Sequence, residues 1–276
     1  MKFSILGNGF VGNALFEGMK HCNDINIYDV DSSKSNSSFE DTLKNEIIFV
    51  CLPTPTNMAG EIDTSIIIET LKRIESSHII VLKSTITPNA CQHIVDLFPK
   101  QKFVVNPEFL TERTAVEDFK NPSRIVLGGN QQSVAKIIDL YRPVFPDTKI
   151  IECDHKTACF IKYFSNCFFA SKVSLMNEFR QIADANNIDW EKSLDGVLSS
   201  GWVNPMHTLV PGPDGDYGFG GKCFPKDINA MIAESKYLNI EPSMLQAAWD
   251  KNLEVRKNKN WLQIEGAFSN KGEENE

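Results

Sequence analysis

Short apolar runs alternate with longer amphipathic segments along the first half of the chain. The apolar runs have the length and the β-branched composition of buried strands, and most of them end at Gly, Pro, Asn or Ser residues. They predict strands at residues 2–6, 25–28, 46–52, 78–82, 102–105, 124–128 and 149–152. Helical patterns, among them 13–20 and 66–74, separate these strands. Such alternation is typical of an α/β fold with a doubly wound parallel sheet of the Rossmann type.

The pattern changes close to residue 153, after which no strand is predicted. Apolar side chains recur at helical spacing within residues 157–186, at Phe160, Ile161, Phe164, Phe168, Leu175 and Phe179. This spacing predicts one long helix whose broad apolar face belongs either to a core or to a dimer interface. Further helices are predicted at 189–198, 227–238 and 242–262, and a Pro- and Gly-rich loop at 202–221.

These patterns divide the chain into parts of different character. We predict a sheet domain at residues 1–152, an all-helical domain built on the long helix at 153–268, and a disordered polar tail at 269–276.

Composition narrows the class of protein. The formal net charge is −8, which disfavours a nucleic-acid binder because such domains are usually basic. Seven cysteines are an odd number without a C-x-x-C pair, so we expect neither a disulfide framework nor a metal site. No apolar run approaches the ~18 residues of a membrane span, and residues 1–6 lead directly into a strand. We therefore expect a cytoplasmic protein that binds no membrane.

A nucleotide-binding fingerprint follows the first predicted strand. Gly7, Gly9 and Gly12 form G-x-G-x-x-G between a strand and a helix, and Phe10 and Val11 complete the motif. The glycines permit a tight turn, close approach of a pyrophosphate to the helix start, and close packing of helix on strand. Asp29 ends the second strand, where its carboxylate would accept hydrogen bonds from a ribose diol and repel a 2′-phosphate. The sequence therefore predicts NAD as the cofactor.

Two further strand ends carry residues suited to the same ligand. Pro53 and Thr54 follow the third strand, and Thr85 follows the fourth. Ligands of open α/β sheets bind outside the carboxyl ends of strands, so these residues are candidate cofactor contacts, with ordinary turn residues as the alternative.

The run Gly218 to Asp227 carries the candidate nucleophile. Cys223 lies in a glycine-rich turn, between Lys222 and Lys226 and four residues before Asp227. Nearby cations favour the thiolate, which is the nucleophilic form of cysteine. A buried structural thiol is the alternative, but an apolar core site would not select glycines and charges around it.

Other candidate polar groups lie before the Cys223 run. Glu108 and Glu112 follow the fifth strand in the segment Asn106 to Glu112. Lys162 and Asn166 are four residues apart on the predicted long helix and therefore share one of its faces, either toward a site or toward solvent.

Taken together, these motifs resemble the UDP-glucose/GDP-mannose dehydrogenase family. The resemblance runs in family order through the glycine fingerprint, Cys51 to Pro55, Lys83 to Ile86, Asn106 to Glu112, Lys162-x-x-x-Asn166, Asn177-Glu178 and Gly218 to Asp227. It implies NAD-dependent four-electron oxidation of the C6 alcohol of a nucleotide-sugar to a carboxylate, UDP-glucose to UDP-glucuronate. It also implies that 1–152 binds NAD and that 153–268 provides catalysis and, through the long helix, a homodimer.

The resemblance further implies roles for individual residues. Cys223 would form a thiohemiacetal and then a thioester, which Glu108 as general base would help water to hydrolyse. Lys162 would stabilise the oxyanion, and Asn166 and Asp227 would position water. Glu112 would belong both to the catalytic residues and to the cofactor contacts. The remaining matched positions would line the site: Thr85 on the cofactor side, and Phe109, Leu110, Phe219, Gly220 and Lys226 at the nucleotide-sugar.

The chain departs from the family pattern in three respects. Arg113 replaces a small residue, Lys222 replaces the serine usual before the cysteine, and relatives usually continue into a second nucleotide-binding domain. Two alternatives therefore stay open: a β-hydroxyacid dehydrogenase, which makes one hydride transfer without a nucleophilic thiol, and a non-catalytic NAD-binding paralogue.

Overall fold

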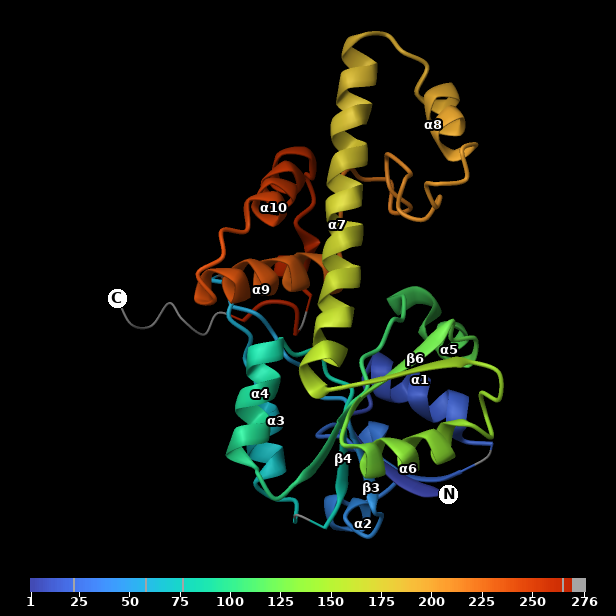
Figure 1. The fold of residues 1–276 in the computed structure, drawn as a ribbon, viewed down its shortest axis with the longest axis vertical. Helices are drawn as coiled ribbons and strands as arrows, with labels where there is room; N and C mark the ends of the chain where they lie inside the picture. Colours follow the sequence, from blue (N-terminus) through green and yellow to red (C-terminus); the bar gives the residue numbers. More distant parts are fainter. Residues whose placement is uncertain (22, 58, 76, 265, 270–276) are drawn as a thin grey trace. The chain divides into compact units, whose positions relative to one another are not determined.

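The first half of the chain is built around one β-sheet, and the second half is helical (Figure 1). The computed structural model describes residues 1–21, 23–57, 59–75, 77–264 and 266–269. Contacts divide the chain into two units, the first made of Met1–Thr54 and Asp63–Lys162 and the second of Pro55–Ile62 and Tyr163–Glu276. Most of the tail predicted to be disordered, 270–276, lies outside the described residues.

The sheet of the first unit has seven strands in the order β2-β1-β3-β4-β5-β6-β7. They are β1 (Lys2–Leu6), β2 (Asp24–Tyr28), β3 (Ile47–Val50), β4 (Ile79–Leu82), β5 (Lys102–Val105), β6 (Arg124–Gly129) and β7 (Lys149–Cys153). Every neighbouring pair is parallel except β5 and β6. The predicted α/β fold is confirmed, but the sheet is mostly rather than wholly parallel. The β5–β6 connection contains only two short helices, whereas a parallel pair needs a crossover along the full strand.

Helices cover both faces of this sheet (Figure 1). They are α1 (Phe10–Met19), α2 (Phe39–Thr42), α3 (Ser65–Leu71), α4 (Pro88–Leu97), α5 (Ala115–Lys120) and α6 (Gln131–Tyr141), with short 3-10 helices η1 (Ser32–Lys34) and η2 (Glu112–Thr114). On one face, apolar side chains of α1, α5 and α6 pack against alternate residues of the central strands, such as Phe3 and Ile5 of β1. This alternation is the period of a strand that faces a different layer on each side.

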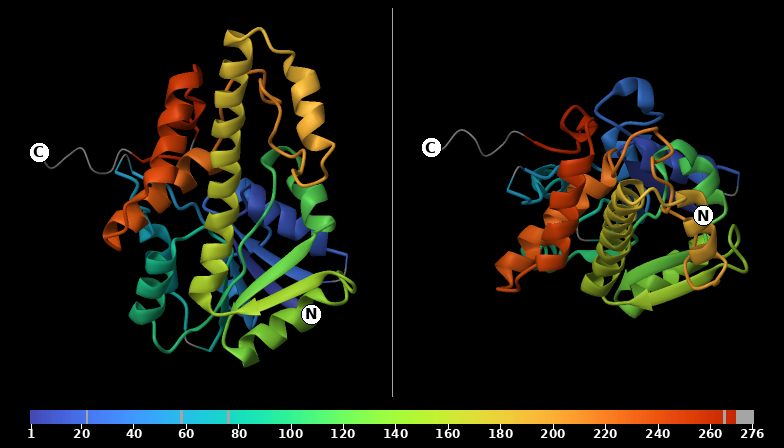
Figure 2. Two further views of the ribbon diagram at one scale, coloured as in Figure 1. Left: turned by 45° about the horizontal axis from the view of Figure 1, so that its top comes forward. Right: turned by 90° about the horizontal axis from the view of Figure 1, so that it is seen from above.

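The second unit is assembled from helices. Its elements are most of α7 (His155–Ala185), then α8 (Trp190–Leu198), α9 (Cys223–Tyr237), α10 (Ser243–Val255) and η3 (Asn260–Leu262). The predicted long helix is confirmed as one uninterrupted element, which both views of Figure 2 show. For the helix predicted at 227–238, the predicted start is wrong. The corresponding helix α9 already begins at Cys223, so this cysteine is the first helical residue rather than part of the glycine turn.

The apolar face of α7 is largely exposed. Phe160, Phe164, Phe168, Leu175 and Phe179 are 49–64% exposed, and they recur along one side of the helix. Of the two predicted places for this face, a core or an interface, the core is therefore excluded for these side chains.

Candidate active site

The glycine fingerprint forms the tight turn between β1 and α1. Gly7 has φ +90°, and a Cβ there would lie 2.7 Å from Cys51 O. A Cβ on Gly12 would lie 2.0 Å from Gly7 O, so helix and turn approach too closely for any side chain. A Cβ on Gly9 would meet no protein atom within 4 Å. The open space therefore lies at the start of α1, where backbone N–H groups favour a pyrophosphate.

Asp29 is held in place at the end of β2. Its Oδ2 accepts from Asn8 N at 2.6 Å and its Oδ1 from Asp31 N at 2.9 Å. Each carboxylate oxygen can accept more than one hydrogen bond, so both stay able to receive a ribose hydroxyl. The glycine turn, the open position at Gly9 and this oriented carboxylate fit an NAD molecule.

The other candidate cofactor contacts lie around the same strand ends. Thr54 is buried and its Oγ1 donates to Thr85 O at 2.7 Å, which ties the segment after β3 to the segment after β4. Pro53 is exposed, and Phe10 and Val11 are half-buried in the first turn of α1.

Glu108 and Lys162 form a buried ion pair in the first unit. Lys162 Nζ donates to Glu108 Oε1 at 2.8 Å, and each side chain is only 4% exposed. Glu108 Oε2 accepts from Leu110 N at 2.6 Å, and Lys162 Nζ lies 5.6 Å from the centre of the Phe109 ring. Glu112 opens η2, and its side chain lies outside the described part of the structure. The pair concentrates opposite charges in a water-poor environment, where they act more strongly than at the surface.

A second polar cluster lies in the helical unit. Asn166 Nδ2 donates to Asp227 Oδ2 at 2.5 Å, and Lys226 Nζ donates to Asp227 Oδ1 at 2.5 Å. Lys226 Nζ also lies 6.0 Å from the centre of the Tyr163 ring. Lys162 and Asn166 are both buried, so the face that they share does not point to solvent, contrary to the alternative that the sequence left open.

Cys223 begins α9, one helical turn before Asp227. The first turn of this helix carries no acidic residue, and the half-buried thiol lies where the helix start favours negative charge. The structure thus places Cys223 at a helix start, a position that the glycine turn of the sequence did not predict.

The backbone before Cys223 is held by three asparagines. Gly218 N donates to Asn177 Oδ1 at 3.0 Å, Phe219 N to Asn252 Oδ1 at 2.7 Å, and Gly221 N to Asn260 Oδ1 at 3.1 Å. These asparagines come from α7, α10 and η3. We call them the asparagine clamp. It fixes Phe219 and Gly220, the predicted nucleotide-sugar contacts, within the helical unit.

The sequence did not assign a structural role to two asparagines of the clamp or to Lys83. Asn252 and Asn260 of the clamp lie outside the motifs quoted for the resemblance, and the only signal for Asn252 is an amide residue within an otherwise amphipathic helix. Lys83 is buried, and its Nζ donates to Asn106 Oδ1 at 3.0 Å. Burial lowers the pKa of Lys83 from 10.5 to about 8.

Among the described residues, no group of three or more His, Cys, Asp or Glu side chains is placed to hold a metal ion. No helix within the described part of the chain is long and apolar enough to cross a membrane.

The mostly parallel sheet and the glycine turn define a Rossmann-type dinucleotide-binding protein. Residues 33–145 match the NAD binding domain of the UDP-glucose/GDP-mannose dehydrogenase family, and residues 156–254 match its central domain. The chain belongs to this family, and it contains the family's NAD-binding domain.

Individual relatives agree with this assignment. The chain is 36% identical to UDP-glucose 6-dehydrogenase of Rickettsia bellii over 238 residues, which are 80% of this chain and 52% of the relative. It superimposes on a UDP-glucose dehydrogenase of Pyrobaculum islandicum with a TM-score of 0.81 at 25% identity, over 92% of this chain and 68% of that one. A 3-hydroxyisobutyrate dehydrogenase of Mycobacterium tuberculosis shares the fold at 16% identity, with a TM-score of 0.72 and 92% of both chains covered. The chain spans about half the length of most of the curated relatives that it matches.

Proposed function

We propose that this protein is an NAD-dependent nucleotide-sugar dehydrogenase that oxidises the C6 alcohol of UDP-glucose to the carboxylate of UDP-glucuronate. The observation that carries the proposal is the placement of Cys223 at the start of α9, next to the clamped glycine turn and one turn before the Asp227 cluster. A simple alcohol dehydrogenase has no use for such a thiol.

The division of labour follows the two matched domains. Residues 1–152 would bind NAD, with Gly7, Gly9, Phe10, Val11 and Gly12 at the pyrophosphate and Asp29 at the ribose. Pro53, Thr54, Thr85 and Glu112 are proposed as further contacts on the cofactor side. Residues 153–268 would provide catalysis and dimerisation. When bound, NAD supplies the acceptor for the hydride that leaves C6 in each of the two oxidations.

The thiol of Cys223 links the two oxidations. Its thiolate would add to the C6 aldehyde and form a thiohemiacetal, which becomes a thioester once the second hydride has left carbon. Attack of water on the thioester then breaks the C–S bond and returns the thiol. Without the covalent link, the second oxidation would depend on a hydrated aldehyde that is free to leave.

Charged side chains would stabilise and direct these steps. Lys162 would stabilise negative charge on the C6 oxygen, and Glu108 would accept the proton of the attacking water. Asn166 and Asp227 would orient that water. Phe109, Leu110, Phe219, Gly220 and Lys226 are proposed as contacts to the nucleotide-sugar.

The NADH yield at limiting UDP-glucose tests the proposal. Two NADH for each sugar are expected from the wild-type chain, and Cys223→Ser should release no uronate. Normal uronate formation by that variant would contradict the thioester route. One NADH with small hydroxyacids and none with UDP-sugars would favour the β-hydroxyacid reaction, and NAD binding without turnover would favour the non-catalytic alternative.

We also propose that two copies of the chain pair through the exposed apolar face of α7. Five large side chains at 49–64% exposure along one helix face form a surface that monomeric proteins rarely leave open. Dimers with twofold symmetry are the commonest oligomers, and one helix face can serve both copies. A monomeric mass in light scattering at about 10 μM would contradict this pairing.

A further inference from the structure

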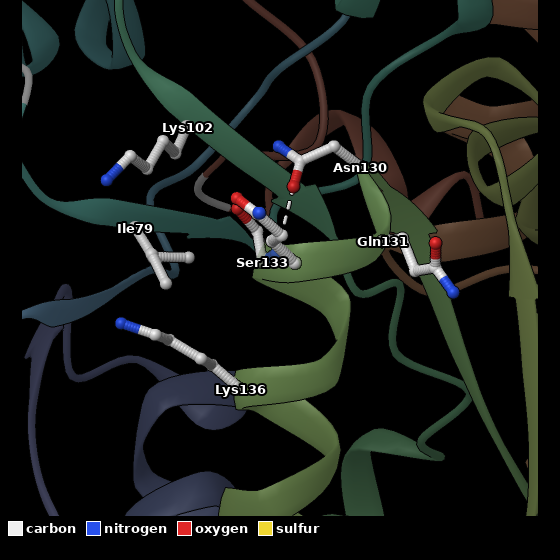
Figure 3. Close-up of a pocket in the computed structure, with 7 residues that line it drawn as sticks. Ile79, Lys102, Asn130, Gln131, Ser133 and Lys136 are labelled. Atoms are coloured by element: carbon white, nitrogen blue, oxygen red, sulfur yellow. Dashed lines mark hydrogen bonds between the residues drawn. The ribbon is translucent and has the colours of Figure 1, made fainter.

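A cavity of about 300 Å³ lies at the edge of the sheet where the parallel strands begin. It is lined by Ile79, Lys102, Asn130, Gln131, Gln132, Ser133 and Lys136 (Figure 3). Ile79 and Lys102 are the first residues of β4 and β5, whereas the glycine turn follows the last residue of β1. The cavity therefore lies within the first unit, at the opposite edge of the sheet from the proposed NAD site.

The start of α6 forms one wall of this cavity. Asn130 caps the helix, and its Oδ1 accepts from Ser133 N at 2.9 Å (Figure 3). The N–H groups of Gln131 and Gln132 have no carbonyl partner inside the helix because they belong to its first turn. A helix of eleven residues thus presents its positive end to the cavity.

Ser133 is an independent indication of a ligand. The residue is 2% exposed, and the cap occupies its backbone N–H. Its hydroxyl has no hydrogen-bond partner among the described residues, although the side chain lines the cavity. This oxygen does not belong to the fully enclosed side-chain atoms that lack a partner, so it reaches the open space of the cavity, where a polar group of a ligand would pair with it.

The charged side chains that line the cavity have one sign. Its lining contains two lysines, three amide side chains and a hydroxyl, but no carboxylate. Lys136 also pairs with Glu46, and both of those side chains are 52% exposed. Lys102 is exposed and has no acidic partner among the described residues. In a chain with a net charge of −8, a cavity whose lining has two ammonium groups and no carboxylate favours an anion.

We propose that this cavity binds a small phosphate monoester through its phosphoryl group. The first-turn N–H groups, the Ser133 hydroxyl and the ammonium of Lys102 provide the donors that phosphoryl oxygens accept from. The cavity has about ten times the ~30 Å³ that one water molecule occupies in the liquid, so it also has room for the organic part of an ester.

Calorimetric titration of the full chain tests the site. The probes are inorganic phosphate and glucose 6-phosphate, with glucose as the neutral control, at constant ionic strength. Saturable binding of the ester is expected, weakened about tenfold by Lys102→Gln and several-fold by Ser133→Ala. Lys72→Gln, which removes an exposed lysine at the end of α3, should leave binding unchanged. NAD binding by each variant verifies that it is folded.

Three results would overturn the proposal. The first is no saturable binding of the ester up to about 10 mM. The second is equal binding by the wild-type chain, Lys102→Gln and Ser133→Ala, which would mean that the anion binds elsewhere. The third is binding of inorganic phosphate without the ester, which would exclude a monoester as the ligand. None of these results depends on turnover of a nucleotide-sugar.

Discussion

Asn252 pairs with both backbone polar groups of Phe219. Its Oδ1 accepts from Phe219 N at 2.7 Å, and its Nδ2 donates to Phe219 O at 3.0 Å. Asn252 is fully buried and Phe219 is 5% exposed, so water cannot easily replace either bond. The side chain therefore satisfies the two buried backbone groups of Phe219 in the way that a neighbouring strand would.

Asn252→Ala should destabilise the protein because it leaves two buried backbone groups without these partners. We expect the free energy of unfolding, measured by urea denaturation, to fall by about 2–4 kcal/mol. Asn252→Asp keeps an acceptor for Phe219 N but places an oxygen against Phe219 O, so it should rescue little. Asn186→Ala, at an exposed position, is the matched control. An unchanged free energy of unfolding in Asn252→Ala would refute the clamp.

Gly9→Ala should separate NAD binding from folding. The backbone at Gly9 has φ −74°, which alanine adopts without strain, and its Cβ would meet no protein atom. We expect normal urea denaturation but at least about tenfold weaker NAD binding in a fluorescence titration, because the methyl group would occupy the approach to the pyrophosphate.

Gly12→Ala is the contrasting variant. Its Cβ would lie 2.0 Å from Gly7 O, so backbone must move, and we expect a loss of several kcal/mol in the free energy of unfolding. Equal effects of the two substitutions on folding would contradict the assignment of open space to Gly9.

Substitutions of Glu108 and Lys162 should have strongly non-additive effects on the free energy of unfolding, because the two charges form a buried pair. Lys162→Met should lower the free energy of unfolding by about 3–5 kcal/mol, because it leaves a buried carboxylate without its cation. Adding Glu108→Gln removes the stranded charge and should recover most of that loss. A double-mutant cycle in urea measures both. A double variant as unstable as Lys162→Met alone would show that the charges do not interact.

Because burial lowers the pKa of Lys83, we expect the stability of the protein to rise with pH. The unfolded chain keeps the proton up to a pKa of 10.5, whereas the folded protein releases it above about 8. Between these values the unfolded state binds more protons, so the free energy of unfolding increases with pH. The full gap corresponds to about 3 kcal/mol. Compared with Lys83→Met, the wild-type chain should gain stability from pH 8 to pH 10.5, while exposed Lys72→Met should follow the wild type. Parallel curves for the wild type and Lys83→Met would contradict the lowered pKa.

Charges on the apolar face of α7 should separate the proposed dimer. Phe164→Glu combined with Phe168→Glu places two carboxylates at positions 64% and 58% exposed, so folding should change by no more than about 0.5 kcal/mol. Light scattering should then report half the wild-type mass. Tyr237→Glu, at 76% exposure on α9, is the control. A double variant with the wild-type mass would exclude this face as the interface.

Local signals predicted the fold better than the contacts of the site. The strands were predictable because each is a run of apolar residues bounded by turn residues, as in Lys102–Val105. The antiparallel direction of β6 was not predictable, because a strand's direction depends on its connection rather than on its composition. The pairing of Glu108 with Lys162 joins residues 54 positions apart and is set by tertiary packing. The early start of α9 was missed because the glycines before Cys223 indicate a turn, while Pro225 is well suited to a first helical turn.

The division between the two units falls inside α7, between Lys162 and Tyr163, with no loop at that point. The chain also passes from the first unit to the second at Pro55 and returns at Asp63. In the second unit, this eight-residue excursion is tied down by hydrogen bonds that link Thr56 to Ala267 and to Ser269. Neither unit is therefore a continuous stretch of sequence. A fragment that stops at residue 152 would keep a piece of the helical unit and lose the cation that neutralises Glu108. A clean separation of the first unit therefore requires a cut after Lys162 together with replacement of residues 55–62 by a linker between Thr54 and Asp63.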